Sequence, residues 1–113
     1  MAIFLLKKSY QVSNQKEIGF KDLWGSHGVF TTIRLLGKPG KLILFKSHIK
    51  GLIKSLKKYK IYSKNIETNI KRLIYLNINK NINYDHLFRI ALTKKIISIL
   101  LGSYLFNSFK IFL

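Results

Sequence analysis

Side chains that could carry out chemistry are few in this sequence, and their spacing assembles no reactive centre. The absence of cysteine excludes disulfides, thiolate metal sites and a cysteine nucleophile. The histidines His27, His48 and His86 share no ligand spacing on one helix, so we expect no metal site. Ser26 and His27 are adjacent, but neighbouring loop residues do not form a nucleophile–base pair without an orienting acid. The two aspartates are isolated, so no carboxylate pair is available for acid–base catalysis.

The most informative pattern is the stretch GSHGVFTTIRLL, residues 25–36, in which a glycine-rich entry leads into a strand. Alternate residues of a strand face opposite sides of its sheet. The odd-numbered set is the more aliphatic, and we expect it to face helices: Val29, Thr31, Ile33 and Leu35. The even-numbered set offers a ring, a hydroxyl and a guanidinium to the other face: Phe30, Thr32, Arg34 and Leu36. Chemistry alone favours packing of Phe30 under a loop and a solvated Arg34 over a binding site.

The elements that position this strand follow from hydrophobic periodicity and turn residues. Two helices are predicted, one after Ser47 and ending near Lys60, the other beginning near Asn65 and ending around 79–83. Strands are predicted over residues 2–6, 29–36, 42–45, 86–93 and 96–101, and residues 10–12 form a weak return strand. This order predicts an α+β fold, βββ-αα-ββ, in which both helices cover one face of a mostly antiparallel sheet of about five strands.

The net charge of +17, from 21 basic and 4 acidic residues, raises the hypothesis of a nucleic-acid or anionic-membrane binder. Lysine greatly outnumbers arginine and is scattered, and Lys, Ile and Asn all have A/T-rich codons, so we expect no specific nucleic-acid binding. Residues 96–113 are apolar but short and interrupted for a membrane span, so a buried strand with a tail is preferred to a tail anchor. No signal peptide is evident, and a cytoplasmic protein is expected. A small basic, non-enzymatic protein that binds nucleic acid or anionic membrane remains the alternative function.

Three short motifs occur in an order and spacing that belong to one family. They are GVFTTIR at 28–34, HIKGL at 48–52 and LFRIALTKK at 87–95. Residues 1–95 thereby resemble the N-terminal small domain of class IV aminotransferases. These are fold-type IV pyridoxal phosphate (PLP) enzymes, which include branched-chain and D-amino-acid aminotransferases and aminodeoxychorismate lyases. The Phe-Thr-Thr triplet is closest to the lyase branch.

The resemblance implies that PLP lies in a cleft between this domain and a larger one, in a homodimeric protein. It implies that Phe30 and Thr32 line the substrate pocket and that Arg89 or Lys94 attracts the substrate carboxylate. A second domain or a second chain would complete the cleft.

Departures from the family pattern bear on activity. The family's Schiff-base lysine, the acid at the pyridine nitrogen and the phosphate-binding turn all belong to the second domain, which these residues do not include. The phosphate-binding arginine of the helix motif is Gly51 here, and Lys94-Lys95 replaces the Arg-Gly that usually ends the last strand. We therefore expect a truncated fragment that neither binds PLP nor catalyses alone, with residues 96–113 as a diverged last strand or an apolar tail.

Overall fold

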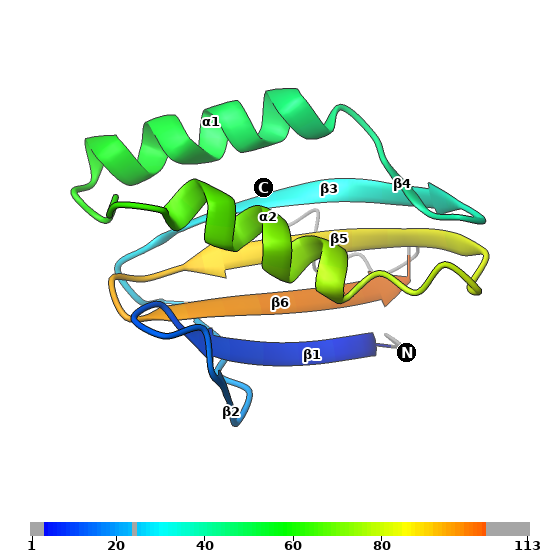
Figure 1. Ribbon diagram of the computed structural model, residues 1–113, viewed down its shortest axis with the longest axis horizontal. Helices are drawn as coiled ribbons and strands as arrows, with labels where there is room; N and C mark the ends of the chain where they lie inside the picture. Colours follow the sequence, from blue (N-terminus) through cyan, green and yellow to red (C-terminus); the bar gives the residue numbers. More distant parts are fainter. Residues whose placement is uncertain (1–3, 24, 104–113) are drawn as a thin grey trace.

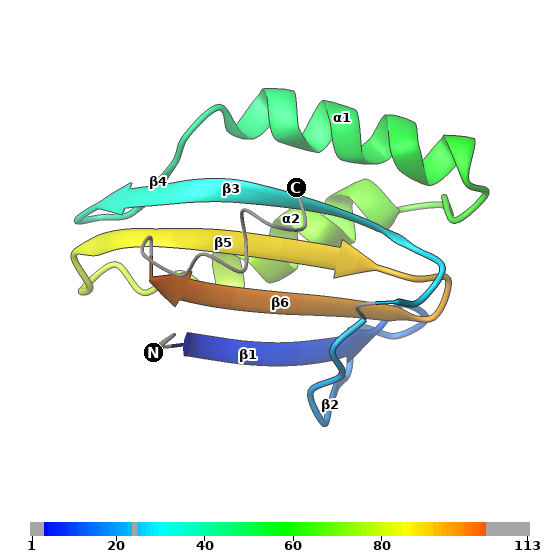
Figure 2. The same ribbon diagram turned by 180° about the vertical axis from the view of Figure 1, so that it is seen from behind.

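The computed structural model describes residues 4–23 and 25–103, which form two layers (Figures 1 and 2). A six-stranded sheet, antiparallel throughout with strand order β2-β1-β6-β5-β3-β4, forms one layer, and two helices cover one of its faces. The elements are β1 (Phe4–Gln11), β2 (Glu17–Ile18), β3 (Val29–Gly37), β4 (Lys41–Leu42), α1 (Phe45–Lys58), α2 (Ile66–Leu76), β5 (Tyr84–Leu92) and β6 (Ile96–Ser103). The predicted α+β sandwich is confirmed, with six strands in the described residues where about five were expected.

The core lies between the helix-facing side of the sheet and one aliphatic stripe of each helix. In β3 the odd-numbered Val29, Ile33 and Leu35 are buried, as the alternation of residue types predicts. The fourth member of that set, Thr31, makes a 3.0 Å hydrogen bond with His48 of α1. The helices contribute buried residues at helical spacing: Ile49, Leu52, Ile53 and Leu56 from α1, and Ile66, Ile70, Leu73 and Ile74 from α2.

The N-terminal strand differs from its predicted form. Residues 2–6 and 10–12 were expected to be two strands, yet residues 4–11 form the single strand β1. The polar residues between them pair in register with β6, Lys8 with Ile99 and Ser9 with Ser98. Backbone pairing requires no apolar side chain, so the polar interruption does not end the strand.

The start of α1 also differs from its predicted position. The helix begins at Phe45 rather than after Ser47, and the expected strand at 42–45 ends at Leu42. Leu44 adopts a left-handed conformation, with φ 56°, and turns the chain from the sheet into the helix. The backbone therefore turns through a residue whose type does not mark a helix start.

The last described strand occupies an interior position of the sheet. Residues 96–103 form β6 between β1 and β5, and Ile97 and Ile99 are fully buried. Residues 104–113, the rest of the suggested tail anchor, lie outside the described part of the chain. Over 4–23 and 25–103, no helix is long and apolar enough to cross a membrane.

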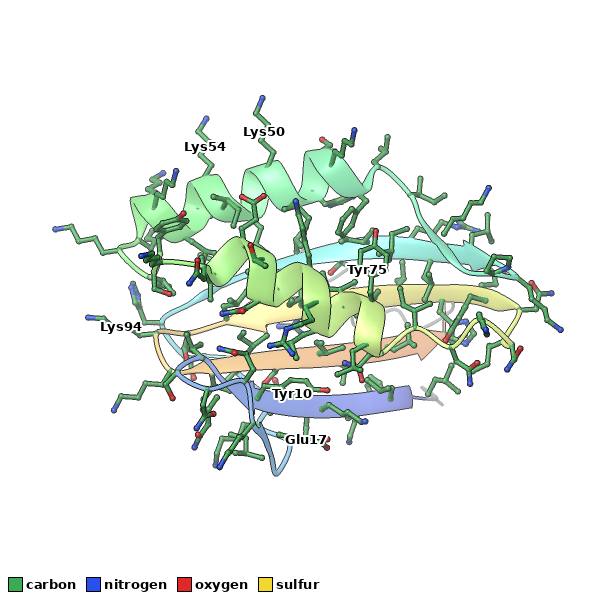
Figure 3. All side chains as sticks on the ribbon, viewed as in Figure 1. Tyr10, Glu17, Lys50, Lys54, Tyr75 and Lys94 are labelled. Atoms are coloured by element: carbon green, nitrogen blue, oxygen red, sulfur yellow. The ribbon has the colours of Figure 1, made fainter. Side chains whose placement is uncertain are left out.

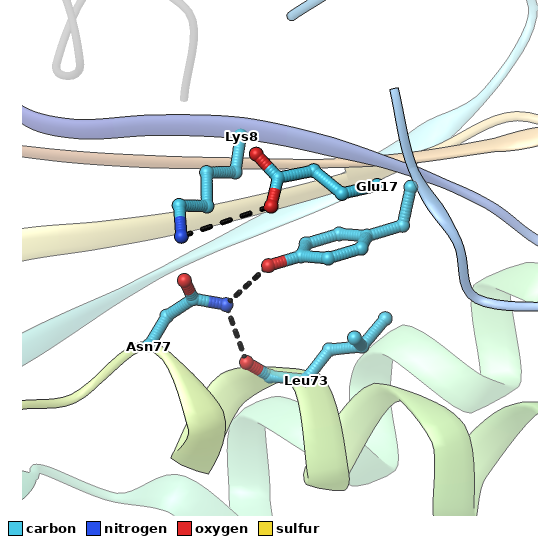
Figure 4. A network of polar contacts seen from close by, with 5 residues as sticks. Lys8, Glu17, Leu73 and Asn77 are labelled. Carbon is cyan, nitrogen blue, oxygen red and sulfur yellow. Dashed lines mark hydrogen bonds and ion pairs between the residues drawn. The ribbon is translucent and has the colours of Figure 1, made fainter. Parts of the chain in front are cut away.

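A buried polar contact ties β1 to the end of α2 (Figure 4). The side-chain amide of Asn77 donates hydrogen bonds to the Tyr10 hydroxyl at 3.0 Å and to the Leu73 carbonyl at 2.8 Å. Tyr10 is 3% exposed. The nearby ion pair between Lys8 and Glu17, at 3.8 Å, is exposed and contributes less.

We expect Tyr10→Phe to lower the free energy of unfolding by about 0.5–1.5 kcal/mol, because one amide hydrogen of Asn77 loses its partner in the core. Urea unfolding followed by circular dichroism measures the change. Tyr62→Phe, at a 44% exposed tyrosine, is the matched control and should change stability little. Equal losses in the two variants would contradict a role for this contact.

Candidate functional site

The candidate site lies on the sheet face opposite the helices, where β3 and β5 are neighbours. Thr32 of β3 is the direct cross-strand partner of Arg89, and Phe30 pairs with Ala91. Phe30 is thus diagonal to Arg89, a separation that long side chains span. The Arg89 guanidinium carbon lies 4.8 Å from the centroid of the Phe30 ring, a cation–π contact.

A chain segment crosses this face before β3 begins and forms a small pocket with it. The pocket measures about 120 Å³, which is room for several waters or a small carboxylate. Its lining includes Leu23, Gly25, Ser26, Gly28, Phe30 and Arg89. The glycine-rich entry and Phe30 of β3 therefore line one small pocket.

Two buried serines hold this crossing segment against the sheet. The hydroxyls of Ser9 and Ser98 are 2.6 Å apart. Ser98 donates to the carbonyl of Lys21 at 2.7 Å, and the amide of Lys21 donates to the Ser9 hydroxyl at 2.9 Å. These contacts place Asp22 and Leu23 beside Arg89 in a second, smaller recess.

Arg89 and Thr32 carry polar atoms that the described part of the chain does not satisfy. The Nε of Arg89 and the Oγ1 of Thr32 are buried, and neither has a hydrogen-bond partner there. Burial lowers the pKa of Arg89, and the carboxylate of Asp22 acts in the opposite direction. An arginine remains charged at neutral pH, so this face holds a partly desolvated cation next to a hydroxyl. Arg89 lines the small pocket and Thr32 does not, so an anionic acceptor in that pocket would meet the guanidinium alone.

The structure does not bring Lys94 into this site. Lys94 is exposed in the turn between β5 and β6 (Figure 3). It lines a separate cleft of about 890 Å³, together with Lys21, Lys64 and Lys95. Of the four residues expected to form the pocket, Phe30, Thr32 and Arg89 are neighbours and Lys94 is apart.

The position of the family's phosphate-binding arginine does not fit a phosphate group. Gly51 is on α1, and a Cβ added to it would meet nothing within 4 Å. The adjoining hollow, about 300 Å³, is lined by Phe30, Thr31, Ser47, His48, Gly51, Leu52 and Ser55, with no lysine or arginine among them. Lys50 lines a different groove on α1. A PLP phosphate would find no lysine or arginine in this hollow, so the residues there do not fit that group.

The histidines have separate surroundings. The ring of His27 lies 6.1 Å from that of Tyr59, edge to face, and His86 accepts a hydrogen bond from the amide of Asp85. The ring of His48 shares a hydrogen bond with the hydroxyl of Thr31. Among the residues that the structure describes, no three potential metal ligands are grouped.

Sequence reasoning missed the serine pair that positions the crossing segment. The one available signal was Ser98, a single serine in the apolar run IISILL of β6. A hydroxyl buried in such a run needs a hydrogen-bond partner. Ser9 gave no such signal, because it follows two lysines in a polar stretch.

Comparisons of this chain with models of protein families, with curated proteins and with solved structures found no match. The class defined by the structure is therefore that of the fold, an α+β sandwich with helices on one face.

Gly28, at the entry to β3, permits the close approach of β3 and β5. A Cβ at this position would overlap the carbonyl oxygen of Leu92. We expect Gly28→Ala to destabilise the fold by about 1–3 kcal/mol, because backbone must move. Gly19→Ala is the control, since a Cβ there meets nothing within 4 Å, and its effect should stay within about 0.5 kcal/mol. Thermal unfolding of both variants measures the difference. Similar melting temperatures would contradict a need for glycine at position 28.

Proposed function

We propose that these residues form the N-terminal small domain of a class IV aminotransferase-like or aminodeoxychorismate lyase-like protein. In this proposal the face with Phe30, Thr32 and Arg89 is one wall of a pocket for a substrate carboxylate. The observation that carries the proposal is the placement of Arg89, which is half-buried on the open face and stacked on Phe30. The order and spacing of the three motifs support the choice of this family.

The chemistry assigned to this wall is recognition and orientation. A guanidinium accepts a planar carboxylate through two parallel hydrogen bonds, and stacking on Phe30 limits the orientation of that plane. Thr32 is the cross-strand partner of Arg89, and its hydroxyl is buried. A pocket of about 120 Å³ holds a carboxylate and not a whole amino-acid substrate, so a second domain or chain must supply the other wall.

Bond making and breaking is assigned to groups outside these residues. PLP held by a second domain would supply the electron sink for amino-group transfer or elimination. The resemblance locates its lysine, its acidic partner and its phosphate turn in a second domain, and the hollow beside Gly51 offers no phosphate-binding cation. We therefore propose that the 113 residues alone hold a carboxylate weakly and do not catalyse.

The carboxylate site is tested by NMR titration of the ¹⁵N-labelled chain with 4-methyl-2-oxopentanoate, with its neutral amide as the ligand control. We expect saturable shifts at Arg89 and Thr32 for the acid and none for the amide. Arg89→Met should weaken binding at least tenfold, about the loss of one charge-assisted hydrogen bond.

Arg34→Met is the matched control, because Arg34 lies on the same face but is paired with Asp85 at 3.0 Å. Binding should survive this change. Chemical-shift changes spread over the exposed lysines would contradict a site at Arg89. Equal losses of affinity in the Arg89 and Arg34 variants would contradict it as well.

The family assignment has a separate test in the DNA that follows the codon for Leu113. Translation in all three frames should reveal a further domain with a lysine and a downstream acid that continue the family pattern. Finding no such domain, there or on a second chain that co-purifies with this one, would overturn the assignment and leave the basic binding protein as the better hypothesis.

A further inference from the structure

A second surface feature lies on the opposite side of the molecule, between the two helices. It is a groove of about 810 Å³, with an apolar floor and a cationic rim. Ile49 and Ile53 of α1, only 4% and 8% exposed, form the floor. The rings of Phe45 and Tyr75 meet edge to face, 5.7 Å apart, at the end where α1 begins and α2 ends.

The rim is formed largely by lysines at helical spacing on α1. Lys46, Lys50 and Lys54 follow one another at intervals of four residues, and Lys57 continues the row. Figure 3 shows Lys50 and Lys54 projecting from the side of α1 that faces away from the sheet. Like charges four residues apart destabilise a helix, so this row costs stability in the isolated domain.

The chain has no acidic side chain to spare for this row. It contains four acidic residues in all. Three are engaged in ion pairs, Glu17 with Lys8, Glu67 with Lys71, and Asp85 with Arg34. The fourth, Asp22, acts on Arg89 on the other face of the sheet. Glu67 and Lys71 lie on the α2 side of the groove and pair with each other. Among the described residues, the lysines on the α1 side therefore have no carboxylate as an ion-pair partner, and a partner protein could supply one.

The shape of the groove selects among anionic partners. Its apolar floor is recessed between two helices, so a flat bilayer surface would meet the rim and not the floor. A nucleic acid would present phosphates to the rim but no apolar ridge to the floor. The apolar ridge of an amphipathic helix fits such a groove, and acidic residues on its flanks would meet the lysines.

We infer that the groove between α1 and α2 is a docking site for an acidic amphipathic helix of a partner protein. The 14 residues of α1 span about 21 Å, so the partner helix contributes about four turns. Phe45, Ile49, Ile53 and Tyr75 receive its apolar side chains, and Lys46, Lys50 and Lys54 pair with its carboxylates. This site is separate from the carboxylate pocket, and its test is independent of the proposed function.

The test uses the whole chain and a fluorescent 18-residue peptide, with leucines at i, i+3, i+4 and i+7 and glutamates elsewhere. Anisotropy at 150 mM salt measures its affinity. The first control peptide has the same composition but leucines spread around the helix, and the second has lysine in place of glutamate. We expect the acidic amphipathic peptide to bind at least tenfold more tightly than either.

Variants locate the binding surface. Lys50→Glu with Lys54→Glu should weaken binding at least tenfold, and Tyr75→Ala, at an exposed groove residue, severalfold. The matched control, Lys38→Glu with Lys80→Glu, has the same net charge at exposed positions outside the groove and should bind like the unmodified chain.

Three outcomes would overturn the inference. Equal binding of the two acidic peptides, or equal losses in the two double variants, would mean adsorption to positive charge. Tighter binding of an 18-nucleotide oligo-dT or of vesicles with 30% phosphatidylserine at the same lysines would assign the surface to nucleic acid or membrane. Self-association that the Lys50→Glu, Lys54→Glu variant abolishes would assign the groove to a second copy of this chain.

Discussion

The alternation of side chains along β3 and β5 is the constraint on which the rest of the structure depends. Both helices need one apolar sheet face, and the aliphatic residues at alternate positions supply it. Once Ile33 and Phe88 face the helices, Thr32 and Arg89 must face away, because they are next in each strand. A shift of one residue in either strand would place a guanidinium in the core. The burial of the core and the geometry of the candidate site are therefore one and the same requirement.

The extent to which the sequence predicted this arrangement depends on how local each signal was. Both helices, β3 and β5 were predicted because their apolar spacing lies within a single segment. The continuity of β1 was not, because its polar middle is stabilised by pairing with β6, almost ninety residues away. The start of α1 was misplaced because Leu44 makes a turn that its residue type does not announce.

The candidate site shows the same division. The alternation of residue types predicted that Phe30 and Thr32 face away from the helices. Their proximity to Arg89 follows from the register of a single strand pair, β3 with β5. The position of Lys94 depended on where β5 turns into β6, and the serine contacts joined segments far apart in the chain. No local pattern encodes such contacts. The lysine excess of the sequence does not by itself identify a binding surface. In the folded chain, several of these lysines form a row along α1.

The position of β6 has a consequence for how the domain is assembled. β1 joins the rest of the sheet only through β6, which is the last described element in the chain. During synthesis, β1 must therefore wait until the elements from β2 to β5 and then β6 have emerged before it can pair with β6. Closure of so long a loop is costly in entropy and slows folding. During that time the edge of β1 that later pairs with β6 stays open, and chaperones or aggregation compete with β6 for it.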